Sequence, residues 1–193
     1  MDGVNILLDG VCKPLFPYLG TPKAIRDRLA ENPPDLVAFT HEHKDHFDDS
    51  YVAEYRQKTL RPVYGPESLH SATLCDGIQI TMEKTRHIGK TDIAHVSIIL
   101  KGSSCVWFMG DASPLVLKQL KGCPAPDVLI VPFAYAASPS AWRYTKETGT
   151  DKIMILHMPG EGDDKDGIWE TVRNTVRKDA SVLIPEMGET IIF

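Results

Sequence analysis

The chain has 193 residues, of which 42% are hydrophobic and 24% are charged, enough for a domain with a well-buried core. Its formal net charge is −5, and its Lys and Arg residues are scattered rather than clustered. Proteins that grip a phosphate backbone usually carry a basic surface, so we expect no nucleic-acid partner. We expect one domain over residues 1–193.

The cysteines and the apolar segments indicate which class of protein this is. Cys12, Cys75, Cys105 and Cys123 lie far apart and form no Cys-x-x-Cys pair, so neither a disulfide framework nor a thiolate zinc site is indicated. No apolar run approaches the roughly 20 residues that span a bilayer, and no secretion signal is recognisable. We therefore expect a cytoplasmic protein without a membrane partner.

The first part of the chain predicts two strands and two helices. The segment 4–10 (VNILLDG) is a short apolar run closed by a turn signal, as in a buried strand. A helix should follow over 21–34, because Thr21 can cap it and a proline pair can end it. The segment 35–40 (DLVAFT) predicts a second buried strand, and 48–58 predicts a second helix.

The rest of the chain predicts three successive strands and then strands alternating with helices. Such alternation indicates an α/β fold in which helices lie outside packed sheets. The expected strands cover residues 78–85, 95–102, 104–110, 127–133 and 152–157, and the expected helices cover 112–122, 138–149 and 165–179. The last segment, 181–193, predicts two strands around a glycine turn.

The most unusual feature of the sequence is the loop that follows the strand at 35–40. It reads H-x-H-x-D-H over 41–46 and holds three of the seven histidines of the chain. A solvated polar loop is the simplest interpretation of such residues. Imidazole and carboxylate groups in this spacing are also ligands for zinc, manganese or iron, so the loop predicts a metal site.

Residues of the same kind stand at the ends of later strands. His87, Asp111 and His157 each follow an expected strand. Loops at the carboxyl ends of strands form the site in α/β sheets, so these residues can converge on the histidine loop. Two metals roughly 3.5 to 4 Å apart need a bridging carboxylate, for which Asp111 is the candidate. Such a pair would activate water against a carbonyl or phosphorus centre.

Together, THEHKDH at 40–46, a later His, Gly-Asp after a strand and His after a late strand resemble the metallo-β-lactamase superfamily. Within it, the chain is similar to the small hydrolases related to ascorbate-phosphate lactonase. The resemblance implies an α/β fold, a four-layer αββα sandwich, with a dinuclear metal site. Asp9, in the motif ILLDG, resembles the family's aspartate that steadies the histidine loop.

The resemblance also implies a ligand set and a cofactor. It assigns one metal to His41, His43 and His87, the other to Asp45, His46 and His157, and both to Asp111. The implied cofactors are two divalent metal ions, zinc first, with manganese and iron as alternatives. Asp45 would orient the attacking hydroxide, and Asp45 or His157 would carry the proton for the leaving group.

Two assignments stay open at this stage. His87 is preferred over His95 as the third histidine because it ends a strand, as the family's third histidine does, whereas His95 opens one. Several aromatic residues near strand ends could face a ligand or equally well pack in the core. These are Phe16, Tyr18, Tyr135 and Trp142.

The chain departs from the family pattern at its start. Relatives usually begin with two further strands before ILLDG, and here only MDGVN precedes it, so we expect the first strand pair to be absent. An exposed sheet edge invites pairing with another chain. The alternatives are a homo-oligomer that covers this edge and a shortened gene model.

The function that these features favour is hydrolysis of a small, anionic ester or lactone. The alternatives are a phosphodiesterase of a small nucleotide and a non-catalytic metal-binding module of the same fold. A diiron redox protein would have a carboxylate at the position of His43, and nucleases of the superfamily carry long insertions and basic arms. A β-lactamase is not indicated, because no secretion signal is present.

Overall fold

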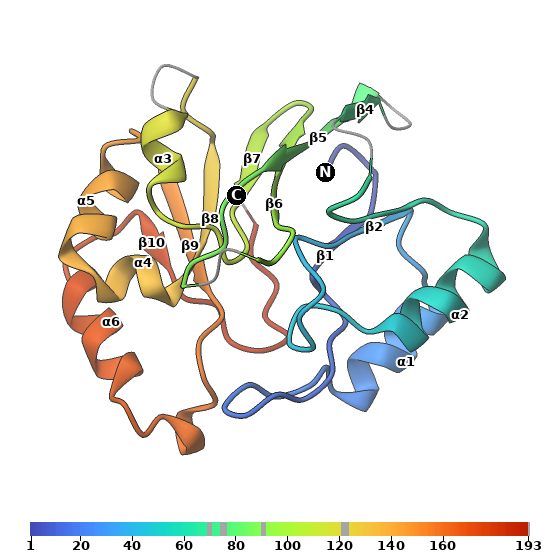
Figure 1. The fold of residues 1–193 in the computed structure, drawn as a ribbon, viewed down its shortest axis with the longest axis horizontal. Helices are drawn as coiled ribbons and strands as arrows, with labels where there is room; N and C mark the ends of the chain where they lie inside the picture. Colours follow the sequence, from blue (N-terminus) through green and yellow to red (C-terminus); the bar gives the residue numbers. More distant parts are fainter. Residues whose placement is uncertain (69–70, 74–76, 90–91, 121–123, 193) are drawn as a thin grey trace.

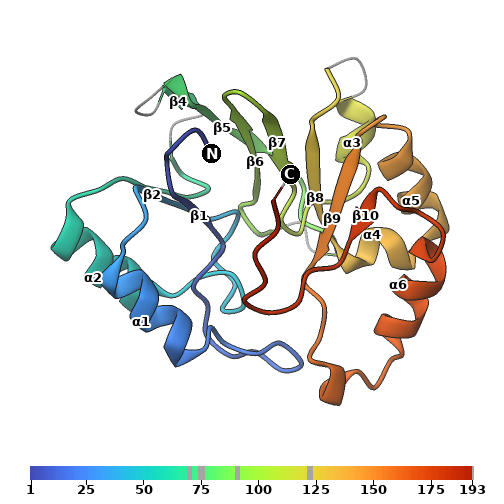
Figure 2. The same ribbon diagram turned by 180° about the vertical axis from the view of Figure 1, so that it is seen from behind.

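Two sheets pack face to face, and helices cover the outer side of each sheet (Figure 1). The computed structural model describes residues 1–68, 71–73, 77–89, 92–120 and 124–192. Figure 2 shows the same arrangement from behind, with α1 and α2 beside the smaller sheet and α3 to α6 beside the larger one. The expected four-layer αββα arrangement is therefore present.

The smaller sheet has three parallel strands in the order β1-β2-β3. Its strands are β1 (Ile6–Leu8), β2 (Leu36–Ala38) and β3 (Val63–Tyr64), and its helices are α1 (Lys23–Glu31) and α2 (Asp49–Thr59). Side chains alternate along β2, so Leu36 and Ala38 face the larger sheet while Val37 and Phe39 contact the side of α2. Strand β1 forms one edge, and the expected pairing of this edge with another chain stays a prediction.

The larger sheet has the strand order β10-β9-β8-β7-β6-β5-β4, parallel from β7 to β10 and antiparallel from β4 to β7. Its strands are β4 (Ser71–Thr73), β5 (Gln79–Lys84), β6 (Val96–Lys101), β7 (Cys105–Phe108), β8 (Val128–Pro132), β9 (Lys152–Leu156) and β10 (Val182–Leu183). The helices beside it are α3 (Val116–Gln119), α4 (Phe133–Ala137), α5 (Pro139–Lys146) and α6 (Ile168–Val176), with a short 3₁₀ helix, η2, at Glu161–Asp163.

The apolar core lies in two main layers. Between the sheets, Ile80, Met82 and Ile98 pack against residues of β2. Between the larger sheet and its helices, Leu129 and Ile155 belong to a second cluster of fully buried residues. Burial of such side chains stabilises the fold by about 1.5–3 kcal/mol each. None of the helices in the described ranges is both long and apolar enough to cross a bilayer.

The structure corrects several expectations about local elements. Only Val182–Leu183 forms a strand in the last segment, and 189–192 is not a strand, so the expected strand pair around the glycine turn is wrong. Helix α1 is capped by Pro22 without a side-chain bond, because the Thr21 hydroxyl instead donates to the Gly10 carbonyl. Cys75 and Cys123 lie outside the described residues.

Two tyrosines on α2 differ in one hydrogen bond, so substitutions of them measure how much this bond contributes to the stability of the fold. The Tyr55 hydroxyl donates to the Pro34 carbonyl at 2.8 Å, whereas the buried Tyr51 hydroxyl has no hydrogen-bond partner in the described protein. We expect Tyr55→Phe to lower the free energy of unfolding by about 1–2 kcal/mol. Tyr51→Phe should leave it unchanged or raise it, since an unsatisfied hydroxyl is removed. Equal losses in urea denaturation of the two variants would contradict this.

Candidate metal centre

A buried carboxylate, that of Asp9, organises the histidine loop. Asp9 follows β1, and its backbone N–H donates to the Ala38 carbonyl at 3.0 Å, which continues the pairing of β1 with β2. Its carboxylate accepts hydrogen bonds from the Thr40 N–H at 2.8 Å, the Thr40 hydroxyl at 2.6 Å and His46 Nδ1 at 2.8 Å. The sheet register thus fixes the position at which the loop begins.

These bonds set the tautomers of the histidines. The single hydroxyl hydrogen of Thr40 goes to Asp9, so the contact of 3.0 Å between Thr40 Oγ1 and His41 Nδ1 requires the imidazole to donate. His46 Nδ1 donates to Asp9, and His87 Nδ1 donates to the Ile88 carbonyl at 2.5 Å. In all three rings Nε2 remains as the nitrogen that can bind a metal.

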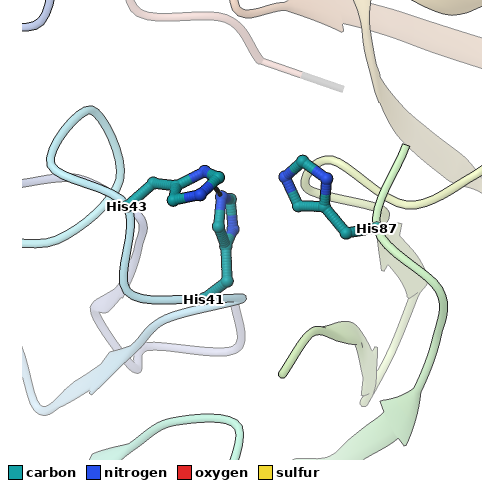
Figure 3. A group of neighbouring side chains, drawn as sticks. All are labelled: His41, His43 and His87. Carbon is teal, nitrogen blue, oxygen red and sulfur yellow. Dashed lines mark hydrogen bonds between the residues drawn. The ribbon is translucent and has the colours of Figure 1, made fainter. Parts of the chain in front are cut away.

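One group of possible ligands consists of His41, His43 and His87 (Figure 3). Their ligand atoms all lie within 4.8 Å of one another, and His41 Nε2 is 3.0 Å from His43 Nδ1. Two of these residues come from the loop after β2, and His87 comes from the segment after β5 on the other sheet. Figure 3 shows His87 reaching toward the pair from the opposite side.

A second group consists of Asp45, His46 and His157, again with ligand atoms within 4.8 Å of one another. His157 Nε2 lies 3.3 Å from Asp45 Oδ2. His157 follows β9 and has a φ of 63°, in the left-handed region that costs free energy for a residue other than glycine. A third overlapping group, Asp9 with His41 and His46, shares its histidines with the other two.

Asp111, which follows β7, lies between the two groups. Its Oδ2 atom is 3.6 Å from His87 Nε2 in the first group, and 3.5 Å from His46 Nε2 and 3.7 Å from His157 Nε2 in the second. The segments that carry Asp111 and His87 are tied together, because the Ile88 N–H donates to the Asp111 carbonyl at 2.7 Å. The carboxylate is therefore placed where a bridging ligand would be needed.

The structure also distinguishes His87 from His95. His95 Nε2 accepts the backbone N–H of Asp111 at 3.0 Å, and its Nδ1 lies 2.7 Å from Thr85 Oγ1. Both ring nitrogens of His95 thus have hydrogen-bond partners, and His95 fixes the position of the Asp111 backbone. His87, as expected, is the histidine grouped with His41 and His43. Its role as a metal ligand stays a prediction.

The donor atoms of the two groups fit a cation. Five buried side-chain atoms in them have no hydrogen-bond partner within the described protein: Asp45 Oδ1, His46 Nε2, His87 Nε2, and both ring nitrogens of His157. Buried polar atoms are nearly always paired, so such a concentration at one place indicates a missing ligand. Imidazole and carboxylate donors match zinc, manganese or iron.

A cavity of about 670 Å³ adjoins the second group, with Asp45 and His157 in its wall. Of the aromatic residues considered from the sequence, Tyr18 lines it, and its ring centroid is 4.1 Å from that of His157. Tyr135 is fully buried and bonds to the Ala112 carbonyl, and Trp142 packs against the same core. Trp169, which lines the cavity from α6, was not predicted from the sequence.

Comparison with known proteins supports the fold. No family model and no curated protein matches the chain. Among solved structures, an isothiocyanate hydrolase from Delia radicum gut bacteria is 17% identical (TM-score 0.65, 100% of this chain, 94% of that chain). Igni18, a metallo hydrolase from Ignicoccus hospitalis, is 19% identical (TM-score 0.66, 99% and 91%). A diphosphatase from the PhnP family is 16% identical (TM-score 0.54, 100% and 81%).

All three structures share one fold, that of the metallo-β-lactamases. The chain has the metallo-β-lactamase fold. The described residues also carry the histidine and aspartate clusters at the strand ends, as the resemblance in the sequence implied.

The charged groups at this candidate centre strongly affect one another's pKa values. Burial lowers the pKa of His41 to about 2, so this imidazole is neutral and ready to bind a cation. Burial would also lower the pKa of His46, but the carboxylates of Asp111 and Asp9 raise it to about 10. Burial alone would raise the pKa of Asp111, yet the nearby imidazoles hold it below its ordinary range.

Zinc binding should release a proton from His46. The metal-free imidazole holds two protons up to about pH 10, and a metal at Nε2 must displace one of them. The apparent affinity should then rise about tenfold per pH unit between about pH 6 and 9, since protons compete less well as pH increases. Calorimetry in buffers of different ionisation enthalpy measures the protons released. An affinity that is independent of pH would contradict this.

Gly110 allows the two sheets to approach at the centre. A Cβ there would lie 2.6 Å from the Thr40 side chain, and the φ of Gly110 is +54°. We expect Gly110→Ala to displace Thr40 from Asp9 and to lower zinc affinity about 10–100-fold. Gly149→Ala is the control, because Gly149 has a φ of +75° with nothing within 4 Å of its Cβ position. The strain of a positive φ should cost both variants about 1–2 kcal/mol of stability, and Gly110→Ala should lose more because of the collision, but only Gly110→Ala should lose affinity. Equal zinc affinity in the two variants would contradict the proposed role of Thr40.

Proposed function

We propose that the chain is a metal-dependent hydrolase that opens a small ester or lactone. The observation that carries this proposal is the position of Asp111, whose Oδ2 atom is within 3.5–3.7 Å of imidazole nitrogens from both ligand groups. A carboxylate shared between two cation sites is the arrangement that two-metal hydrolases require. The protein would therefore use a pair of metals rather than one.

The residues that would hold the metals are those implied by the sequence resemblance. His41, His43 and His87 would hold one ion, Asp45, His46 and His157 the other, and Asp111 both. When bound, such ions supply Lewis acidity toward a carbonyl oxygen and lower the pKa of water to about 7. Zinc, manganese and iron all fit this donor set, with zinc the first choice.

Asp45 is the proposed proton carrier. Its Oδ1 atom is buried and unpartnered, and the residue belongs to the wall of the large cavity, so its carboxylate lies beside the space proposed for a substrate. Burial alone would raise the pKa of Asp45, but His157 and His46 lower it, and the carboxylate is ionised. It can accept a proton from the attacking water and return it to the leaving oxygen as the carbon–oxygen bond breaks.

The comparisons support hydrolysis but leave the substrate open. The three structures of similar fold are described as an isothiocyanate hydrolase, a metallo hydrolase and a diphosphatase, and hydrolysis is common to them. Their identities of 16–19% carry over the fold alone. Two alternatives to an esterase therefore stay open: a phosphodiesterase of a small nucleotide and a non-catalytic metal-binding module.

We expect the purified protein to contain up to two metal ions per chain and to hydrolyse esters or lactones without an electron donor. Asp111→Ala should lower metal content and reduce kcat/KM by at least about 100-fold, because both ions lose a ligand. Elemental analysis and a screen of lactones, aryl esters and phosphodiesters, before and after chelation, measure both effects. Activity that survives complete metal removal would contradict the proposal.

Glu42→Ala provides the control for this variant. Glu42 is exposed and lies in the histidine loop, at a position that the motif leaves free. Its replacement by alanine removes one negative charge, as Asp111→Ala does. Its metal content and turnover should stay within about twofold of the parent protein. Comparable losses in the two variants would mean that the loop acts through its overall charge. Metal binding without turnover of any substrate would instead favour the non-catalytic module.

A further inference from the structure

The cavity beside the metal centre is large enough to hold part of a substrate. Its volume of about 670 Å³ lies within the range of small-molecule sites. Besides Asp45, four separate segments form its wall: the loop at Tyr18 and Leu19, the segment 155–161, helix α6 and the segment 185–187. Because Asp45 and His157 belong to the same wall, a group held here would lie next to the reacting centre.

Much of the wall is apolar. It includes Leu19, Met158, Trp169 and Met187. The indole N–H of Trp169 donates to the Pro159 carbonyl at 2.9 Å, so its polar atom is already used within the protein. Arg173 lies over one face of the ring, and the remaining ring surface can make apolar contact.

The wall in the described ranges contains no Lys or Arg side chain. Its charged members outside the metal groups are Glu161 and Glu186, both acidic. Arg173, which contacts two wall residues, already has partners: it is 2.8 Å from Glu161 and lies 4.7 Å over the Trp169 ring. A carboxylate or phosphate held in the described wall away from Asp45 and His157 would therefore meet no Lys or Arg side chain of that wall.

We infer that the substrate carries an uncharged, apolar group, an alkyl chain or aryl ring, and that this cavity selects for it. This inference rests on the proposed hydrolase function and adds the substrate class. It departs from the anionic substrate that we expected from the sequence, because the charges of this wall are acidic or paired. The cavity holds the apolar group while the ester bond lies at Asp45 and His157.

The test compares two esters of equal length with the metal-loaded protein. The uncharged ester is 4-nitrophenyl hexanoate, and the charged one is the mono-4-nitrophenyl ester of adipic acid. We expect kcat/KM to be roughly tenfold or more higher for the hexanoate, since the carboxylate would be buried without a partner. From acetate to hexanoate, kcat/KM should rise up to about fourfold per buried methylene. Equal or faster hydrolysis of the adipate ester would overturn the inference.

A charge variant shows whether the cavity itself sets this preference. Met187 is 63% exposed, so Met187→Lys places a cation in the wall at little structural cost. The ratio between the two esters should shrink by up to about fivefold. Leu60→Lys adds the same charge at a position that is 91% exposed and outside the cavity wall, and it should leave the ratio unchanged. Equal shifts in both variants would overturn the inference.

A binding measurement separates this inference from the proposed function. Hexanamide has the same apolar chain without a labile ester, and its binding to the metal-loaded protein can be followed by tryptophan fluorescence. We expect a saturable change that disappears in Trp169→Phe, whether or not any ester is hydrolysed. If no ester is hydrolysed but this change is seen, the proposed hydrolase fails and the apolar cavity stands. No saturable change, or an equal one in Trp169→Phe, would overturn the inference.

Discussion

The centre depends on one buried carboxylate, that of Asp9. A buried carboxylate is costly unless several donors satisfy it, and here three donors from Thr40 and His46 do so. The same bonds leave Nε2 of His41 and His46 as the ligand nitrogen. The Asp9 N–H also continues the hydrogen-bond ladder between β1 and β2. The register of the smaller sheet therefore determines where the candidate ligands of the histidine loop lie.

The two sheets each supply part of the centre. The smaller sheet carries Asp9 and the histidine loop, and the larger sheet carries His87, Asp111 and His157. Their separation is set by the apolar layer between the sheets and by the absence of a side chain at Gly110 opposite Thr40. A packed core deforms little, so the distance between the ligand groups is fixed by the fold before any metal binds. The strained φ of His157 fits this view, because the surrounding structure holds it in place.

Much of this arrangement could be predicted from the sequence, because its signals are local. Apolar runs such as DLVAFT identify buried strands, and the seven expected ligand residues stand at strand ends, where the topology brings them together. The short strands at 63–64 and 71–73 could not be predicted, since two or three residues leave no periodic pattern. Of the two strands expected in the C-terminal segment only Val182–Leu183 forms, beside β9, while residues 189–192 form no strand.

The wall of the cavity could not be predicted for a different reason. Each ligand belongs to a motif with a fixed spacing, whereas Trp169 belongs to the apolar side of an ordinary amphipathic helix and Met187 to an irregular segment. Nothing in their local sequence separates a residue that lines a cavity from one that fills a core. The proposed chemistry thus depends on short motifs, whereas the proposed selection of substrates depends on how four distant segments pack beside Asp45 and His157. Proteins with the same ligand set can therefore act on different substrates when only these segments change.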